Sequence, residues 1–289
     1  MEELKKLRIY EGATAIITGG ASGIGRAIAT ELARRGVEVV VADLQIELAQ
    51  EVAAGITARG GKAAAVKLDV TDYPAVERVV HDTFARTGRL DYIFNNAGIF
   101  IAGAVHQYSI ADWNYIVDIN IRGVINGVQA AYPIMLMQGF GHIVNTGSIA
   151  GLIPAPGEVA YAATKHAVVG LSKSLRAHAG LMGVRVSVLC PGFIRTPMAE
   201  NGGKFGKSYL DITPELRKEL LEKVRPMPPD LFARKVLNAV AKNKAIIIEP
   251  AWWRWFWRIH RLMPQYSITL TQKVFQRTLI KLGLWPKSP

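Results

Sequence analysis

The feature that most constrains the fold is an alternation, along residues 13–250, between short apolar runs and longer stretches of helical periodicity. The short runs are rich in β-branched residues and are bounded by Gly or Asp, which is typical of buried parallel strands. We expect seven such strands, at 13–19, 37–43, 62–69, 90–98, 141–148, 184–192 and 245–250. Helices are expected between them, at 23–35, 45–59, 74–87, 111–137, 158–181 and 230–242. The alternation predicts an α/β fold: one doubly wound, parallel, seven-stranded sheet with helices on both faces.

One segment, residues 196–229, interrupts this alternation between the sixth strand and the last helix. It contains three glycines, a short helical patch at 214–224 and the proline-rich end RPMPP. A long insertion after the carboxyl end of a strand is often functional, so we expect a lid over a substrate site; a disordered surface loop is the alternative. We therefore expect one domain over residues 1–250, with this lid, and a helical extension over 251–289.

Composition limits the functional classes. The 289-residue chain has a formal net charge of +12, which would suit nucleic-acid binding, but the charge is uneven. Residues 251–289 contain seven Lys or Arg and no acid, whereas residues 1–249 contain 28 basic and 23 acidic residues. A single cysteine, Cys190, and a start that lacks the apolar segment of a signal peptide lead us to expect a cytoplasmic protein without disulfides. No apolar run approaches the ~18 residues of a membrane-spanning helix.

A glycine-rich turn, TGGASGIG, follows the first expected strand. It places glycines at 19, 23 and 25 so that the backbone can approach a pyrophosphate at the helix N-terminus, although the spacing alone could equally be a structural turn. Asp43, which ends the second strand, can accept hydrogen bonds from both ribose hydroxyls of an adenosine; a helix N-cap is the alternative. Its carboxylate would repel the 2′-phosphate of NADP. Ser22 occupies the turn position at which a basic side chain could otherwise balance the charge of that phosphate. We therefore expect NAD, with NADP less favoured.

Four motifs in this order make the chain resemble the short-chain dehydrogenase/reductase family: TGGASGIG, NNAG at 95–98, YAATK at 161–165 and PG at 191–192. The resemblance implies a single-domain Rossmann fold that binds NAD(P) and transfers a hydride between an alcohol and a carbonyl. It also implies cofactor contacts from the motifs and the residues that flank them. These residues are Gly19, Ser22, Gly23, Ile24, Gly25, Asp43, Asp69, Val70, Asn96, Ala97, Gly98, Tyr161, Lys165, Pro191, Gly192, Ile194 and Thr196.

The same resemblance implies individual roles within this set. Asp69 and Val70 would flank the adenine, and Asn95 with Asn96 would brace the central strands. Ala97 and Gly98 would let the cofactor pass, while Ile194 and Thr196 would hold the nicotinamide carboxamide.

The catalytic chemistry can be argued from the residues themselves. Oxidising an alcohol requires a base within hydrogen-bonding distance of the hydroxyl. Tyr161 has an ordinary pKa near ~10, but Lys165, four residues further on the same helix face, would favour the tyrosinate together with a positive nicotinamide ring. Ser148, at the carboxyl end of its strand, can hold the substrate oxygen. A buried Asn120 can kink its helix and anchor a water that links Lys165 to solvent.

These four residues, Asn120, Ser148, Tyr161 and Lys165, match the catalytic tetrad of the family. Taken singly, each has a commoner structural explanation, such as an exposed helix pair, a turn serine or a satisfied buried amide. Their joint occurrence in this order of strands and helices favours the catalytic interpretation over a nucleotide-sensing or scaffolding protein that lacks activity. No histidine or cysteine pair has the spacing of metal ligands, so no metal is expected.

The substrate pocket is expected behind the strand ends, with Ala150, Ala155, Glu158 and Phe193 in its wall. The loops 99–104 and 149–155 are mostly apolar and contain no arginine, so they offer no clamp for an anionic substrate. We expect a hydrophobic secondary alcohol or ketone of steroid, retinoid, fatty or terpenoid type; an NADP-dependent carbonyl reductase is the alternative. These apolar residues could also be plain core. The resemblance further implies a homodimer or homotetramer through the helices at 111–137 and 158–181.

The C-terminal extension begins with AWWRWFWRIH, residues 251–260, in which tryptophans alternate with arginines. On a helix, Arg254, Arg258 and Arg261 share one side, and Trp253, Trp257 and His260 lie at its margins. The opposite, apolar side comprises Trp252, Trp255, Phe256, Ile259, Leu262 and Met263. Pro250 suits the first turn of this helix, and Pro264 should end it.

A second basic helix should follow, with Ser267 as its cap and Gly283 as its stop. Its Lys273, Arg277 and Lys281 again share one side. Basic and apolar faces with marginal tryptophans favour a membrane surface as the partner of residues 251–285. The pocket of the enzyme itself and a sister subunit are the alternatives, and nucleic acid is not expected.

Overall fold

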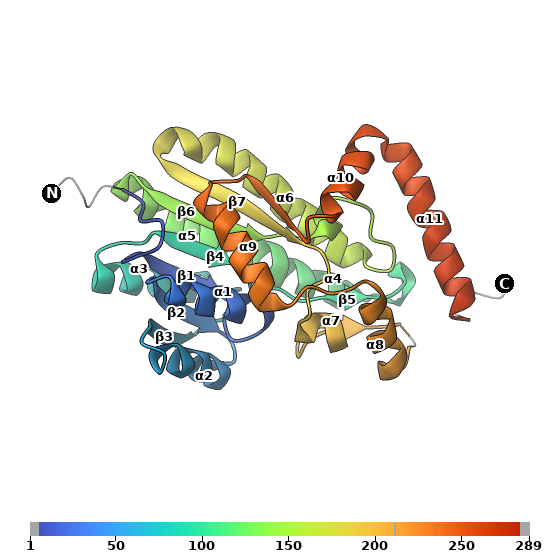
Figure 1. The fold of residues 1–289 in the computed structure, drawn as a ribbon, viewed down its shortest axis with the longest axis horizontal. Helices are drawn as coiled ribbons and strands as arrows, with labels where there is room; N and C mark the ends of the chain where they lie inside the picture. The colour runs from blue at the N-terminus through green and yellow to red at the C-terminus, as the bar shows by residue number, and fades with distance from the viewer. Residues whose placement is uncertain (1–5, 211, 284–289) are drawn as a thin grey trace.

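The computed structural model describes residues 6–210 and 212–283. The first five residues, which bear on the signal peptide, and residues 284–289 of the expected extension lie outside this range. At the centre is a wholly parallel seven-stranded sheet with the order β3-β2-β1-β4-β6-β7-β9 (Figure 1). Its strands are β1 Thr14–Thr18, β2 Glu38–Asp43, β3 Lys62–Lys67, β4 Tyr92–Asn95, β6 Gly141–Thr146, β7 Val184–Pro191 and β9 Ile246–Glu249. Each lies within a predicted range, so the predicted fold class is confirmed.

Helices cover both faces of the sheet (Figure 1). One face carries α1 Gly23–Arg34, α2 Ile46–Thr57 and α9 Pro229–Ala241, and the other carries α3 Tyr73–Thr87, α5 Gly123–Gln138 and α6 Val159–Ala179. Ile28 and Phe232 belong to the apolar cluster on the first face. Val80 and Ile134 belong to the cluster on the second. Because both faces are covered, the inner strands are buried throughout, which explains their continuous apolar runs.

The helix expected at 111–137 contains a local irregularity. It begins as α4, Ile110–Val117, passes through a π-helical turn at Asp118–Arg122 and continues as α5. Asn120 lies in this turn with its side chain fully buried. The distortion expected at Asn120 therefore takes the form of a π turn, which often marks a functional site.

The insertion at 196–229 is folded over its described residues. It contains α7 Pro197–Asn201, a two-residue strand β8 Lys207–Ser208 and α8 Pro214–Lys223. β8 pairs in parallel with β5, Ile101–Ala102, which follows the NNAG motif. The sequence did not predict this pairing, because two-residue strands have no readable periodicity. Asp112 anchors the insertion by accepting hydrogen bonds from Lys207 Nζ at 2.5 Å and the Tyr209 hydroxyl at 2.7 Å. Short 3₁₀ turns complete the chain at Val105–Gln107, Ile149–Gly151 and Gly180–Met182.

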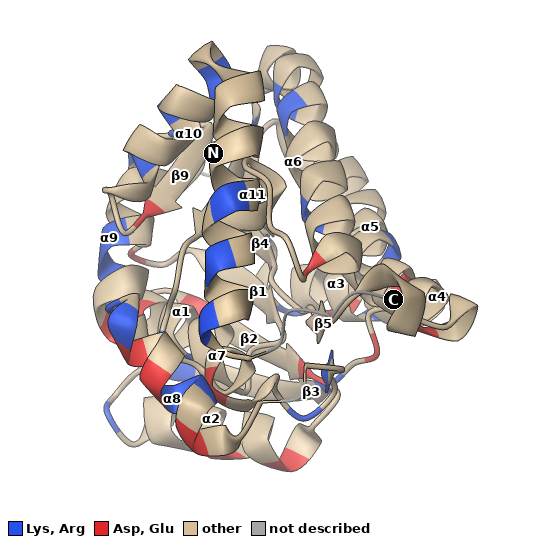
Figure 2. Ribbon diagram, turned by 90° about the vertical axis from the view of Figure 1, so that its right-hand side faces the viewer, with Lys and Arg blue, Asp and Glu red and all other residues tan. Residues whose placement is uncertain are grey.

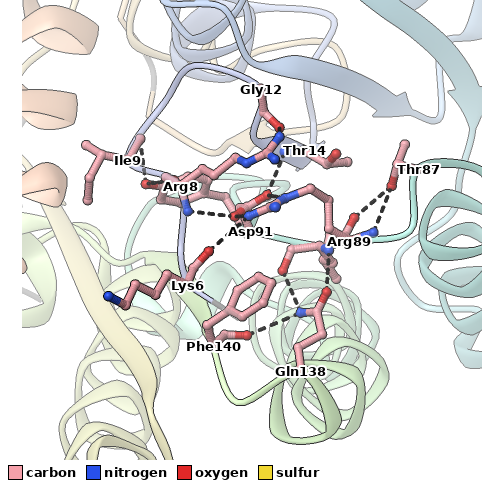
Figure 3. Close-up of polar contacts among 12 residues, drawn as sticks. Lys6, Arg8, Ile9, Gly12, Thr14, Thr87, Arg89, Asp91, Gln138 and Phe140 are labelled. Carbon is pink, nitrogen blue, oxygen red and sulfur yellow. Dashed lines mark hydrogen bonds and ion pairs between the residues drawn. The ribbon is translucent and has the colours of Figure 1, made fainter. Parts of the chain in front are cut away.

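A buried ion pair organises the amino edge of the sheet (Figure 3). Arg89 and Asp91 precede β4, and Arg89 Nε donates to Asp91 Oδ2 at 2.7 Å. The same carboxylate accepts the backbone N–H groups of Arg8 at 3.0 Å and Thr14 at 2.9 Å. The N-terminal segment is thereby held against the first strand, on the side of the sheet away from the expected site.

The extension forms two helices, α10 Trp253–Leu262 and α11 Pro264–Lys281, which fold into a hairpin beside the body (Figure 1). The break predicted at Pro264 is confirmed. Ser267 as a helix cap is wrong, because α11 already begins at Pro264, where proline suits the first turn of a helix. Pro250 lies in the turn before α10 rather than in its first turn. Among the described residues, no helix is both long and apolar enough to cross a membrane.

Candidate active site

A cavity of about 810 Å³ opens at the carboxyl ends of the central strands. It includes the point between β1 and β4 where the strand order reverses, the usual binding position in such sheets. All predicted cofactor residues except Gly25 line it. So do Ser148, Tyr161 and Lys165 and all four predicted substrate-wall residues. The fold thus gathers residues from four separate motifs around one space.

The glycine-rich turn is shaped for close approach. A Cβ at Gly19, which has a φ of +62°, would lie 2.8 Å from the Cα of Ala97. Gly25 does not line the cavity; a Cβ there would lie 2.0 Å from the carbonyl oxygen of Gly19, so it lets α1 pack on the turn. Ser22 precedes α1 without a side-chain cap, and no acid lies in the first helical turn. The helix N-terminus is left open to an anion, so the turn fits a pyrophosphate.

Asp43 holds this turn against the end of β2. Its Oδ2 accepts the N–H of Ala21 at 3.0 Å and its Oδ1 accepts the N–H of Gln45 at 3.0 Å. The residue that precedes α2 as its N-cap is Gln45, so the alternative role of Asp43 as N-cap does not apply. Each carboxylate oxygen keeps a second lone pair for a ligand. Leu44, next in the chain, is half-exposed at the same cavity.

The catalytic candidates meet at the N-terminal half of α6. Lys165 Nζ is buried, donates to the carbonyl oxygen of Thr146 at 2.9 Å and lies 5.5 Å from the centre of the Tyr161 ring. The Tyr161 hydroxyl lies near the Ser148 side chain, which acts to lower the pKa of Tyr161. Ser148 Oγ also accepts the N–H of Ala150 at 3.1 Å, which fixes the serine side chain. A substrate oxygen at the Tyr161 hydroxyl would therefore meet both an acid–base group and a hydrogen-bond donor.

Burial controls the titration of this pair. It raises the pKa of Tyr161, an effect only partly offset by the hydrogen bond with Ser148. It lowers the pKa of Lys165 to about 8. These directions are those of the chain without cofactor, whereas the lowered tyrosine pKa is expected from Lys165 and the nicotinamide ring acting together. The positive nicotinamide ring of an oxidised cofactor would supply the missing charge when bound.

Asn120 does not line the cavity but supports its wall. Its Oδ1 accepts the N–H of Ile99 at 2.8 Å, and its Nδ2 donates to the Ile99 carbonyl at 3.0 Å and to Thr164 Oγ1 at 3.1 Å. A Cβ at Gly98 would lie 3.1 Å from Asn120 Oδ1 and 3.4 Å from Lys165 Nζ. Asn120 therefore ties the strand end at 98–99 to α6 and uses both of its amide N–H donors in doing so, while Oδ1 keeps a second lone pair.

The two asparagines of the NNAG motif bind neighbouring strands. Asn95 Nδ2 donates to Asn145 Oδ1 at 2.8 Å, and Asn96 Nδ2 donates to the Thr18 carbonyl at 3.1 Å. Asn95 is buried below the cavity, whereas Asn96 lines it.

The substrate side of the cavity is mostly apolar. Phe100, Ile153 and Phe205 line it beside the predicted residues. The lid helix α8 adds Arg217 and Lys223 to the wall; the sequence predicts the lid but does not show which of its cations reach the cavity. Arg217 donates to Ser208 Oγ at 3.0 Å and Lys223 pairs with Glu219, so both have partners on the lid.

The extension contributes to the same cavity. Contact with the pocket of the enzyme itself was one of the three partners that the sequence allowed for the extension. Trp253 and Thr278 line it, and the Trp253 ring lies 6.0 Å from that of Phe193. A Cβ at Gly192 would lie 2.2 Å from Trp253 Nε1, so the indole packs directly on the PG motif. Trp253 and Trp257 also pack against the body, in a cluster that includes Leu152. The marginal tryptophans of α10 thus face inward.

The apolar side of α10 faces outward. Trp252, Trp255, Phe256, Ile259, Leu262 and Met263 are between 43% and 83% exposed. Lys and Arg, and no Asp or Glu, occur along α10 and α11 (Figure 2). Arg254 pairs with Glu249 at 2.6 Å. The guanidinium groups of Arg258 and Arg261 lie over the rings of Trp255 and Trp257, each at 5.3 Å.

Comparison with known proteins bears on this site. The family described as short chain dehydrogenase matches residues 13–205. The oxidoreductase UcpA of Salmonella typhimurium is 41% identical over 191 residues, which are 66% of this chain and 72% of that protein. Cyclohexanol dehydrogenase of Acinetobacter sp. strain SE19 is 39% identical over 190 residues, which are 65% of this chain and 76% of that protein. A solved Burkholderia phymatum short chain dehydrogenase/reductase in complex with NAD has a TM-score of 0.76 and 29% identity, covering 98% of this chain and 99% of that one.

Proposed function

The chain belongs to the short-chain dehydrogenase family, oxidoreductases that act on CH–OH groups with NAD(P), and we propose that it transfers a hydride between NAD(H) and a hydrophobic, cyclic secondary alcohol or its ketone. One observation carries the proposal: Ser148, Tyr161 and Lys165 share one cavity wall, between a glycine turn that fits a pyrophosphate and an apolar substrate side. The resemblance to a cyclohexanol dehydrogenase supports a cyclic substrate.

In the oxidation direction, the Tyr161 phenolate accepts the proton of the substrate hydroxyl. The Ser148 hydroxyl donates a hydrogen bond to the substrate oxygen as it becomes a carbonyl oxygen. When bound, the nicotinamide cofactor accepts the hydride. Lys165, held by the Thr146 carbonyl, keeps positive charge near Tyr161 and favours its ionised form. Asn120 acts as a positioning residue, because it fixes the strand end next to Lys165. In the reduction direction Tyr161 returns the proton.

The test is the formation of NADH, followed by absorbance, with cyclohexanol and larger cyclic and acyclic secondary alcohols. We expect kcat/KM to rise with the apolar surface of the alcohol, because the cavity wall around Phe100 and Phe205 is apolar. Cofactor binding without turnover of any alcohol or ketone would favour the nucleotide-sensing alternative and contradict the proposal.

Preference for NAD over NADP rests on Asp43. Its carboxylate faces the cavity beside an apolar Leu44, so a 2′-phosphate would meet a negative charge rather than a cation. We expect kcat/KM to be higher with NAD, and Asp43→Ala to lower it about 10- to 100-fold while improving the relative use of NADP, since a hydrogen bond to a charged group contributes about 1.5–3 kcal/mol. A wild-type preference for NADP would make the alternative NADP-dependent reductase the correct function.

For the extension, we propose that the outward apolar side of α10, with Lys273, Arg277 and Lys281 of α11, binds an anionic lipid surface. Exposed aromatic and aliphatic side chains, together with the seven Lys and Arg of an extension that contains no Asp or Glu, support this partner. The inner side of α10 meanwhile lines the cavity through Trp253. A membrane-bound enzyme would thus hold its pocket next to the phase into which a hydrophobic substrate partitions.

Sedimentation with phosphatidylserine-containing vesicles tests this, using the outward substitutions Trp255→Ser and Leu262→Ser together. These side chains are 65% and 83% exposed, so the fold should survive their loss. We expect the wild type to sediment and the double variant to stay in solution, with pure phosphatidylcholine vesicles as the uncharged control. The surface is instead a subunit interface if two results are found together: the wild type does not sediment with vesicles, and light scattering shows a dimer or tetramer of the wild type that dissociates in the double variant.

A further inference from the structure

Glu158 brings a carboxyl group into the substrate side of the cavity from a fixed backbone. It immediately precedes α6, and its carbonyl oxygen accepts the N–H of Ala162 at 2.8 Å in the first turn. Its own N–H donates to the carbonyl of Ala155 at 3.2 Å. The preceding residue, Gly157, accepts the N–H of Gly103 at 2.8 Å, and Phe275 of α11 packs beside it. Glu158 therefore lines the cavity from a backbone held on both sides.

This carboxyl group lacks partners among the described residues. It forms no ion pair and no side-chain hydrogen bond with any of them. Burial raises the pKa of Glu158 to about 7. Its charge acts to raise the pKa values of Tyr108 and Tyr161, and the Tyr108 hydroxyl already donates to the Gly103 carbonyl at 2.9 Å. The lid cations Arg217 and Lys223 line the same cavity but have other partners.

Glu158 is half-buried, and the part of its carboxyl that is removed from water has no protein group to replace the hydrogen bonds lost, which costs free energy. The cost is recovered only when a ligand or water supplies a partner. The fold also pins the backbone of Glu158, so the group is prepared to meet a ligand atom at a defined place.

We propose that Glu158 hydrogen-bonds a second oxygen of the substrate, so that the enzyme prefers cyclic diols and hydroxyketones to simple cyclic alcohols. Glu158 lies three residues before Tyr161, one turn of helix away, and both line the cavity. A ring whose reacting hydroxyl is at Tyr161 can then direct an oxygen on its far side to Glu158. The carboxylate accepts a hydrogen bond from a hydroxyl, and the neutral acid donates one to a carbonyl, so both substrate classes are served.

This inference rests on the proposed function and assigns Glu158 to specificity. The test compares kcat/KM for cyclohexane-1,4-diol with that for cyclohexanol in the wild type, Glu158→Gln and Glu158→Leu. We expect the ratio of diol to mono-alcohol to fall about 10- to 100-fold in Glu158→Leu and less in Glu158→Gln, whose amide can still form a hydrogen bond. Glu215→Gln, on the exposed first turn of α8, removes a carboxylate outside the cavity and should leave the ratio unaltered. A ratio within twofold of wild type in Glu158→Leu overturns the proposal.

A binding measurement separates this failure from failure of the proposed function. Calorimetry with the same two ligands and with 4-aminocyclohexanol, in the presence of NADH, is done on Tyr161→Phe and on Tyr161→Phe combined with Glu158→Leu, so turnover plays no part. We expect the second change to weaken binding of the diol about 10-fold or more relative to cyclohexanol. An equal loss for both ligands assigns Glu158 to packing alone. A larger loss for 4-aminocyclohexanol than for the diol assigns the site to cations, and either result overturns the proposal even if the enzyme oxidises cyclic alcohols.

Discussion

Two carboxyl groups at opposite edges of the sheet, the buried Asp91 and the half-buried Glu158, differ in their partners. Asp91 accepts hydrogen bonds from two backbone N–H groups and from the guanidinium of Arg89 (Figure 3). Glu158 has no such partner among the described residues, and its pKa is raised to about 7 by burial. Carboxyl groups of one domain thus have separate roles: the fully hydrogen-bonded one at the amino edge holds the chain together, and the one without a protein partner at the carboxyl edge is available to a ligand.

The same contrast extends to neighbouring groups. Lys165 and Tyr161 at the carboxyl edge have pKa values that burial moves away from their usual range. Such shifts are tolerated where a bound molecule restores the missing interactions. Changes at the carboxyl edge should therefore affect turnover, and changes at the amino edge should affect stability.

The largest effect is expected from Tyr161→Phe. Loss of the acid–base hydroxyl should lower kcat about 10²- to 10⁴-fold, the usual contribution of a general acid or base. NADH affinity, measured by fluorescence, and the urea midpoint should change little, because the ring that packs against Phe100 is kept. A near-normal kcat would show that another residue carries the proton.

Asp91→Ala should produce the opposite pattern. It leaves the buried Arg89 without its counter-charge and two backbone N–H groups without acceptors, so the free energy of unfolding should fall by about 3–5 kcal/mol. Urea unfolding gives this loss, and the kcat of the protein that remains folded should stay close to wild type. A large drop in kcat with unchanged unfolding would show that the two edges are not separate in function.

The pH dependence of the free energy of unfolding allows a direct comparison of the two edges. His142, near the start of β6, represents the amino edge, and Glu158 represents the carboxyl edge. Burial lowers the pKa of His142 to about 3 from 6.5, so between these values the unfolded chain holds the extra proton and stability rises with pH. The pKa of Glu158 is raised from 4.5 to about 7, so there the folded chain holds the extra proton and stability falls as pH rises. Each slope is about 1.4 kcal/mol per pH unit, and between pH 4.5 and 6.5 they oppose each other.

We therefore expect these two groups to leave the stability of the wild type nearly flat between pH 5 and 6.5. In Glu158→Gln the His142 contribution remains alone, and the free energy of unfolding should fall by about 2 kcal/mol on acidification across this window. The glutamates with lowered pKa values, Glu31, Glu219 and Glu222, titrate below it. Urea unfolding at several pH values measures both curves, and parallel curves would contradict the assignment.

The smallest effect is expected from Arg86→Gln. Arg86 pairs with Glu38, but the two side chains are 50% and 27% exposed, unlike the buried pair of Arg89 and Asp91. Removing an exposed pair should cost about 0–1 kcal/mol and less at high salt. A cost close to that of Asp91→Ala would mean that burial does not explain the stability of the amino edge.

Much of the fold and of the cavity lining was predictable from local patterns. Runs such as those at 37–43 and 141–148 predict strands because both faces of the sheet are covered, and Pro264 predicts the break between α10 and α11 because proline disfavours a helix interior. The error at Ser267 arose because Pro264 itself starts α11. The motif residues line one cavity because parallel strands bring their carboxyl ends together.

Contacts between distant segments needed the tertiary structure. The pairing of β5 with β8 joins residues more than a hundred positions apart, and Arg217 reaches the cavity only because the lid folds back. Local patterns are enough to give the order of strands and helices and the chemical groups at the strand ends, since these depend on periodicity and turn residues. Three-dimensional packing was needed to show that Trp253 packs inward on Gly192, that Asp91 is fully hydrogen-bonded and that Glu158 has no partner among the described residues. The burial and the hydrogen-bond partners of these residues depend on chain segments that are far apart in the sequence, and the sequence pattern does not show that such segments lie close together.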